Sequence, residues 1–211
     1  MRALIASASV LPEEIAPGLM RWTAPHPDWE GMEDGWERDV GCTLFEADDA
    51  LVLIDPLLPA EGRAEFLQWL DDRVDGRPVS ILTTIHWHVR DREELAARYA
   101  ANSTRSWNQV PAGVQPRPLR GAGETMYWLP AVRTLVPGDR LLGAPGGGLR
   151  LCSQDWLERV NVDRAGLATL MRPLLELDIE RVLVSHGEPV LRDGRAALAR
   201  ALAEVAPSPA G

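Results

Sequence analysis

The sequence has no lysine, and all 22 of its basic residues are arginines. This excludes chemistry that needs a lysine nucleophile or a Schiff base. The sequence also lacks the GxSxG pattern of serine hydrolases. Its two cysteines, Cys42 and Cys152, are far apart and form no CxxC pair. That spacing fits neither a disulfide framework nor a zinc ribbon, and we expect a reduced, cytoplasmic chain.

Long hydrophobic runs are absent as well. No segment approaches the roughly 20 apolar residues of a membrane span, and the apolar stretch in 1–10 is too short for a convincing signal peptide. The formal net charge of −9 disfavours nucleic acid as a partner, because phosphate contacts need clustered cations. With 211 residues, we expect a single domain spanning 1–211. The oligomeric state is not indicated.

The hydrophobic pattern predicts a mixed α/β fold. Strands that pair as hairpins come first, and helices alternating with strands follow. We expect strands at 40–46, 50–54, 79–84, 125–129, 133–136 and 179–185, and helices at 60–72, 92–101, 163–177 and 194–205.

Histidines follow two of the apolar runs. His86 and His88 come directly after residues 79–85, and His186 follows residues 181–185. In an extended backbone, residues two apart project to one side, so His86 and His88 would aim at one point while Trp87 faces away into packing. Neutral imidazole is a common zinc ligand. The pattern favours a metal site, with ordinary hydrogen-bonded histidines as the alternative.

Four short motifs then occur in a specific order. They are Ile54-Asp55-Pro56, His86-x-His88, Gly138-Asp139 and Ser185-His186-Gly187, each at the end of an expected strand or hairpin. Together they resemble the metallo-β-lactamase-fold hydrolases from about Val40 to the C-terminus. The resemblance implies a four-layer αββα sandwich with metal at the strand ends along one edge.

The resemblance also implies roles for individual residues. His86, His88, Asp139 and His186 would be metal ligands, and Asp55 would support the site. Arg90 stands where the family motif HxHxDH has its aspartate, Asp91 stands where it has its last histidine, and a further family histidine has no counterpart. Because a guanidinium has no lone pair for a metal, we expect one ion, zinc, with iron or no metal as alternatives.

The leading functional hypothesis is a hydrolase of a small ester, thioester, lactone or amide. Asp91 would accept the proton of the attacking water, and Arg90 would contact Asp139 or Asp91, or anchor a substrate carboxylate. The competing hypotheses are a non-catalytic protein of this fold that binds a small molecule or a protein, and redox chemistry on iron.

Side chains outside the motifs leave two questions open. Trp29 and Trp36 could line a substrate pocket or cap a core. Glu124 could replace a lost ligand or lie in a solvated turn.

Overall fold

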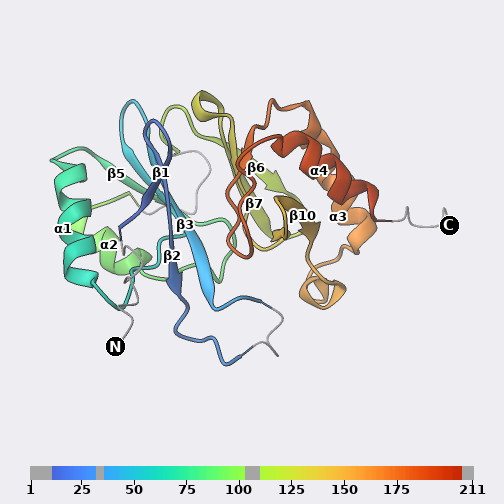
Figure 1. The fold of residues 1–211 in the computed structure, drawn as a ribbon, viewed down its shortest axis with the longest axis horizontal. Helices are drawn as coiled ribbons and strands as arrows, with labels where there is room; N and C mark the ends of the chain where they lie inside the picture. Colours follow the sequence, from blue (N-terminus) through green and yellow to red (C-terminus); the bar gives the residue numbers. More distant parts are fainter. Residues whose placement is uncertain (1–10, 32–35, 103–109, 206–211) are drawn as a thin grey trace, which may run out of the picture.

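The computed structural model describes residues 11–31, 36–102 and 110–205. These form four layers, with two sheet layers enclosed by helices on both outer sides (Figure 1). Helices α1 (Arg63–Val74) and α2 (Arg92–Tyr99) lie on one side, and α3 (Arg164–Met171) and α4 (Gly194–Ala203) lie on the other.

The first sheet has the strand order β1-β2-β3-β4-β5. Its strands are antiparallel except for the last pair, in which β4 and β5 run parallel and are connected through α1. The expected hairpin at 40–54 is the β3–β4 pair. The strands span Glu13–Ala16, Leu19–Pro25, Asp39–Glu46, Leu51–Ile54 and Val79–Leu82.

The second layer contains a sheet of order β11-β8-β7-β6 and the hairpin β9–β10. Strand β11 runs parallel to β8, and the other pairs are antiparallel. The expected hairpin at 125–136 is the β7–β8 pair, joined by a 3₁₀ turn at Pro130–Val132. The strands span Gln115–Leu119, Glu124–Leu129, Thr134–Val136, Leu141–Ala144, Gly148–Leu151 and Arg181–Val182.

Side chains that alternate in direction along the strands pack into the three interfaces between the four layers. In β4, Leu51 and Leu53 pack toward α1 and α2, while Val52 and Ile54 pack between the two sheets. In β7, Met126 and Trp128 pack toward α3 and α4. Because successive strand residues face opposite sides, strands that are apolar throughout must lie in a layer covered on both faces.

Strands β6, β9 and β10 were not expected, and two of the expected elements are shorter than predicted. The helix expected at 163–177 ends at Met171 and continues as a 3₁₀ helix over Arg172–Glu176, because Pro173 cannot donate a backbone hydrogen bond. The strand expected at 179–185 is reduced to Arg181–Val182, since the following residues leave the sheet and cross toward β3. There, the Gly41 amide donates to the carbonyl of Ser185 at 2.7 Å.

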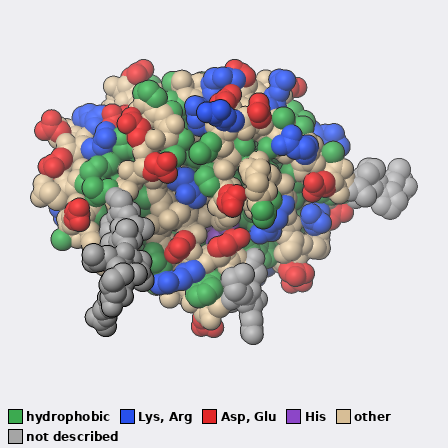
Figure 2. Space-filling model, in the orientation of Figure 1, with side chains coloured by type: hydrophobic (Ala, Val, Ile, Leu, Met, Phe, Trp, Pro, Cys, Tyr) green, Lys and Arg blue, Asp and Glu red, His purple; other side chains and the backbone are tan. Residues whose placement is uncertain are grey.

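Acidic and basic side chains alternate over the face shown in Figure 2, which has no broad surface of one sign. In the described ranges, no helix is long and apolar enough to cross a bilayer.

Candidate metal centre

All four histidines of the chain line one cavity of about 570 Å³. The cavity lies where the parallel pairs β4/β5 and β8/β11 end, since the chain after each of these strands contributes to it. Its lining comprises His26, Asp28, Trp36, His86, Trp87, His88, Arg90, Asp139, Arg140, Asp155, Trp156, Glu158, Arg159, Val160 and His186.

Three buried side chains converge inside this cavity. Oδ1 of Asp139 lies 3.0 Å from Nε2 of His88 and 3.3 Å from Nε2 of His186. Despite these distances, Oδ1 of Asp139 has no hydrogen-bond partner among the described residues. Within the described ranges, one group of possible metal ligands has all its ligand atoms within 4.8 Å of one another, and it consists of His88, Asp139 and His186. Three donor atoms thus face a common point.

Asp55 fixes the orientation of His88. Its Oδ2 accepts a hydrogen bond from Nδ1 of His88 at 2.8 Å, and its Oδ1 accepts one from the Thr84 amide at 2.8 Å. A proton on Nδ1 leaves Nε2 as the atom that faces Asp139, which is the tautomer that a metal ligand needs. Asp55 has a positive φ of 50°, a conformation that aspartate tolerates better than most residues.

The charges of the group depend on each other. Burial opposes a charge on His88, but the carboxylates of Asp139 and Asp55 outweigh it and raise the pKa of His88 to about 9. Burial likewise opposes a charge on Asp139, but His88 and His186 hold the pKa of Asp139 well below its usual range. Without a cation, a proton on His88 offsets part of the negative charge of the two carboxylates, and a metal must displace that proton to bind Nε2.

Trp87 does not face away into packing, as the sequence suggested. The HxH segment is a turn and not an extended strand end, so the alternation of strand side chains does not apply. The indole N–H of Trp87 instead donates to Oδ2 of Asp139 at 2.6 Å, and the residue is 42% exposed. Arg140 lies over this ring, 5.4 Å from its centroid.

For the same reason, His86 lies apart from the converging group. It lines the same cavity, but its side chain is exposed and its ring packs edge-on against Trp87 at 4.5 Å. The structure therefore brings together three of the four expected ligands and leaves His86 at the cavity wall.

Asp91 does not fit its expected role as a proton acceptor. It precedes α2 and is not among the residues that line the cavity. One of its oxygens accepts a hydrogen bond from the Leu58 amide at 2.6 Å, and the other lies 3.8 Å from Arg63. Its carboxylate is used to anchor the chain after β4.

The expectation that Arg90 contacts the carboxylate of Asp139 or Asp91 is also wrong. Its Nη1 donates to the carbonyl oxygens of Asp55 at 2.7 Å and Gly41 at 3.1 Å, and its Nη2 donates to Ser185 at 2.7 Å. Arg90 has a positive φ of 42°, and its side chain lines the cavity.

Glu124 takes neither of the two places that the sequence left open for it. It is neither a solvated turn residue nor part of the converging group, because it is buried at the start of β7. Its two oxygens accept hydrogen bonds from the amides of Gly138 and Arg140, at 3.0 and 2.8 Å, on either side of Asp139. Burial raises the pKa of Glu124 to about 7. No short motif signals such a contact.

Two glycines hold the turn that carries His186. A Cβ at Gly41 would lie 2.4 Å from the carbonyl oxygen of Val184, and one at Gly143 would lie 2.2 Å from that of Glu188. The amide of Gly143 also donates to the carbonyl of His186 at 2.9 Å. The turn is therefore fixed by direct backbone contact on both sides.

Tryptophans form walls beside His186. The ring centroids of Trp36 and Trp156 lie 5.2 and 5.9 Å from that of His186. Of the two tryptophans considered from the sequence, Trp36 lines the cavity, whereas Trp29 supports it by donating to the Trp36 carbonyl at 3.1 Å.

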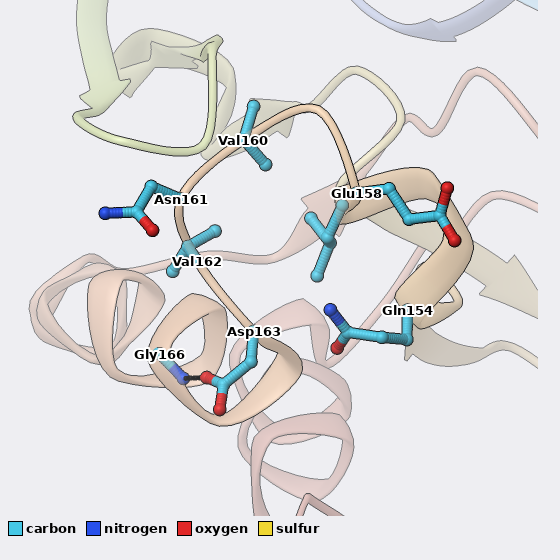
Figure 3. A pocket seen from close by; sticks show the side chains of 8 residues that line it. Gln154, Glu158, Val160, Asn161, Val162, Asp163 and Gly166 are labelled. Atoms are coloured by element: carbon cyan, nitrogen blue, oxygen red, sulfur yellow. Dashed lines mark hydrogen bonds between the residues drawn. The ribbon is translucent and has the colours of Figure 1, made fainter.

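A second, open hollow of about 550 Å³ lies before α3 and shares Glu158 and Val160 with the cavity. Figure 3 shows its side chains, among which Asp163 accepts a hydrogen bond from the Gly166 amide at 2.7 Å. This contact caps α3. No histidine or cysteine lines this hollow.

The converging group fits a divalent cation. Two imidazoles and one carboxylate form a common ligand set for catalytic zinc, which uses three protein ligands and keeps a further position open. Oδ1 of Asp139 is buried, faces the two imidazole nitrogens and makes no hydrogen bond of good geometry in the described residues, so it supplies negative charge that such an ion would neutralise.

The fold that carries this site is similar to those of several solved structures. A metallo-β-lactamase from Erythrobacter litoralis superposes with a TM-score of 0.58 at 14% identity, covering 92% of each chain. The chain has the metallo-β-lactamase fold. A β-lactamase domain protein from Burkholderia ambifaria matches with a TM-score of 0.55 at 15% identity, over 95% of this chain and 78% of the other. A metallo-β-lactamase family protein from Thermus thermophilus matches with a TM-score of 0.54 at 15% identity, over 90% of this chain and 80% of the other.

These likenesses confirm the αββα fold expected for the chain. No protein-family model matches this metallo-β-lactamase-fold sequence, and no curated protein matches it.

The contact between Asp55 and His88 gives a first prediction. Asp55→Asn removes the carboxylate that holds the proton on Nδ1 of His88, so zinc affinity should fall about 10- to 100-fold. Competition with a chromophoric chelator measures the affinity. The control is Asp48→Asn, an exposed aspartate in the turn after β3, which should leave the affinity unchanged. Equal affinities in the two variants would contradict the role of Asp55.

Proposed function

We propose that this protein is a metal-dependent hydrolase of a small ester, thioester, lactone or amide. The observation that carries the proposal is the convergence of His88, Asp139 and His186 on one point in a cavity, with Oδ1 of Asp139 left unpartnered. The likeness to metallo-β-lactamase structures supports the reaction class by analogy of fold.

The side chains of such a site would have two roles, binding the cation and orienting its ligands. His88, Asp139 and His186 would hold the cation, while Asp55 and Trp87 orient two of these ligands by hydrogen bonds. A bound zinc ion supplies a Lewis acid that polarises a carbonyl group and lowers the pKa of water. The tryptophan walls limit access of solvent to one side of His186.

The hydrogen bond from Trp87 to Asp139 favours one ion over two. If Asp139 gave one oxygen to each of two cations, it would need Oδ2, which instead accepts the indole N–H at 2.6 Å. The Arg90 guanidinium adds a fixed positive charge to the same cavity. Two unit charges about 4 Å apart repel by roughly 4 kcal/mol at an effective dielectric of 20, and a divalent ion is repelled more.

Metal stoichiometry is therefore a second prediction. Native mass spectrometry of protein purified without chelator should show at most one tightly bound transition metal, and elemental analysis should identify zinc. Two tightly bound ions would contradict the single-ion site. Bound iron would instead favour redox chemistry.

Turnover tests the hydrolase proposal directly. Chelated protein, reloaded with increasing zinc, should hydrolyse 4-nitrophenyl acetate or an acetyl thioester at a rate that rises in proportion to bound metal and stops rising at one equivalent. Asp139→Asn should abolish this response. Stoichiometric zinc binding without any turnover of esters, thioesters, lactones or amides would favour a non-catalytic binding protein.

A further inference from the structure

The Arg90 side chain is a positive charge that the protein does not pair. Its hydrogen bonds go to two backbone carbonyls, one serine hydroxyl and, at 3.7 Å, the Cys42 sulfur. None of these acceptors is a carboxylate. In the described residues, no carboxylate oxygen lies within 4 Å of the guanidinium. Its Nε is buried and has no hydrogen-bond partner there. A half-buried charge without a counter-ion is unfavourable and is stabilised by a bound anion.

The other two arginines of the cavity are placed differently. Arg140 is 1% exposed, donates to the carbonyls of Ala122 and Trp156, and lies against the ring of Trp87. Arg159 is exposed to solvent, which screens its charge. Among the arginines that line the cavity, Arg90 is therefore the partly buried one, less buried than Arg140 and less exposed than Arg159.

Its contacts place Arg90 beside the converging ligands. Asp55 contacts both Arg90 and His88. Its backbone carbonyl accepts a hydrogen bond from Arg90, and its carboxylate accepts one from His88 and so orients that ring. Ser185, whose hydroxyl accepts a hydrogen bond from Arg90, is the residue immediately before His186 in the sequence. An anion on Arg90 would thus lie next to the reaction site.

The charge of the cavity limits the anion to one negative charge. Three arginines line it together with four acidic residues, Asp28, Asp139, Asp155 and Glu158. A dianion such as phosphate would meet these carboxylates, whereas a carboxylate brings one negative charge to Nη2 of Arg90, which has a second N–H besides the one that it donates to Ser185. The rings of Trp36 and Trp156 offer apolar faces for the rest of the ligand.

We propose that the cavity binds a small monocarboxylate, with its carboxylate on Arg90 and its apolar body against Trp36 and Trp156. This rests on the proposed function in that it defines the substrate class of that site: a molecule with a free carboxylate near its scissile bond. The carboxylate site itself needs no metal.

Two ligands of nearly equal shape test the proposal. Phenylacetate and phenylacetamide are titrated into metal-free and zinc-loaded protein, and tryptophan fluorescence or calorimetry gives the dissociation constants. Phenylacetate should bind at least about tenfold more tightly in both forms, because only its carboxylate forms a charged pair with Arg90. Inorganic phosphate should not compete. Equal binding of the two ligands by the metal-free protein would overturn the proposal, as would displacement by phosphate at equal concentration.

A variant assigns the preference to Arg90. Arg90→Gln should bind both ligands equally. Arg181→Gln should keep the preference, because Arg181 is also partly buried and donates to the Val132 carbonyl at 3.0 Å, but lies outside the cavity. If Arg90→Gln does not fold, Arg90→Lys keeps the charge but not the position of the Nη2 donor, and should reduce the preference several-fold. A full preference in either Arg90 variant would contradict the proposal.

The outcomes separate this proposal from the proposed function. A preference for phenylacetate in a protein that binds no zinc would support the carboxylate site and refute the metal-dependent hydrolase. Zinc-dependent turnover without a preference for phenylacetate would support the metal-dependent hydrolase and refute the carboxylate site.

Discussion

The His88→Ala protein is expected to bind zinc more than 100-fold more weakly than the parent chain and to lose zinc-dependent turnover. The loss should exceed the 10- to 100-fold that removal of an outer hydrogen-bond partner costs, because a site with three protein ligands cannot spare one. His88 is also the residue on which Asp55 and Asp139 converge, at 2.8 and 3.0 Å. Its removal leaves two buried carboxylates facing an empty space.

The matched control is His86→Ala. It removes the same side chain two positions earlier, from an exposed place on the cavity wall. Zinc affinity, measured by chelator competition, should change less than about threefold, in keeping with the small effects of substitutions outside a binding site. If the two alanine variants lose affinity equally, His86 is a fourth ligand and the separation seen in the structure does not describe the metal-bound protein.

The second large effect concerns stability. Gly143→Ala would place a Cβ 2.2 Å from the carbonyl oxygen and 2.6 Å from the amide nitrogen of Glu188. Both neighbours are backbone atoms of the turn after His186, so the overlap can be relieved only by moving that turn. We expect a loss of about 3 kcal/mol in the free energy of unfolding, at the upper end for overpacked sites. The melting temperature should fall by roughly 6–12 °C.

Gly148→Ala serves as the control for Gly143→Ala. Gly148 lies in β10, the strand paired with β9, and a Cβ there would lie 3.4 Å from the Cβ of Ala144, an ordinary contact. Its melting temperature should stay close to that of the parent chain. Thermal unfolding followed by circular dichroism compares the two variants. A Gly143→Ala protein as stable as Gly148→Ala would mean that the turn tolerates displacement.

The sequence predicted which side chains lie together where a strand end determines the position of a side chain. Asp55 follows β4, Asp139 follows β8 and His186 follows β11, and the carboxyl ends of these strands meet at one edge. Apolar runs identify such ends because buried strands must be continuous and hydrophobic. The fold class was predictable for the same reason.

The sequence was misleading where the backbone leaves the strand. The segment from His86 to Arg90 is a turn, so Trp87 and not His86 reaches Asp139. Nor could the partners of Arg90 be inferred, because its acceptors lie 35, 49 and 95 positions away in the sequence. Long-range polar contacts depend on the packing of whole layers, which local patterns do not encode.

The converging ligands come from different halves of the chain. His88 and its partner Asp55 follow strands of the first sheet, whereas Asp139 and His186 follow strands of the second (Figure 1). A cation held by all three would therefore cross-link the two sheet layers, much as a disulfide joins distant segments. Its binding energy would add to the free energy of unfolding, and the gain would grow with the logarithm of free metal concentration. Metal supply would then set how firmly the two layers stay together, as well as whether the site is complete.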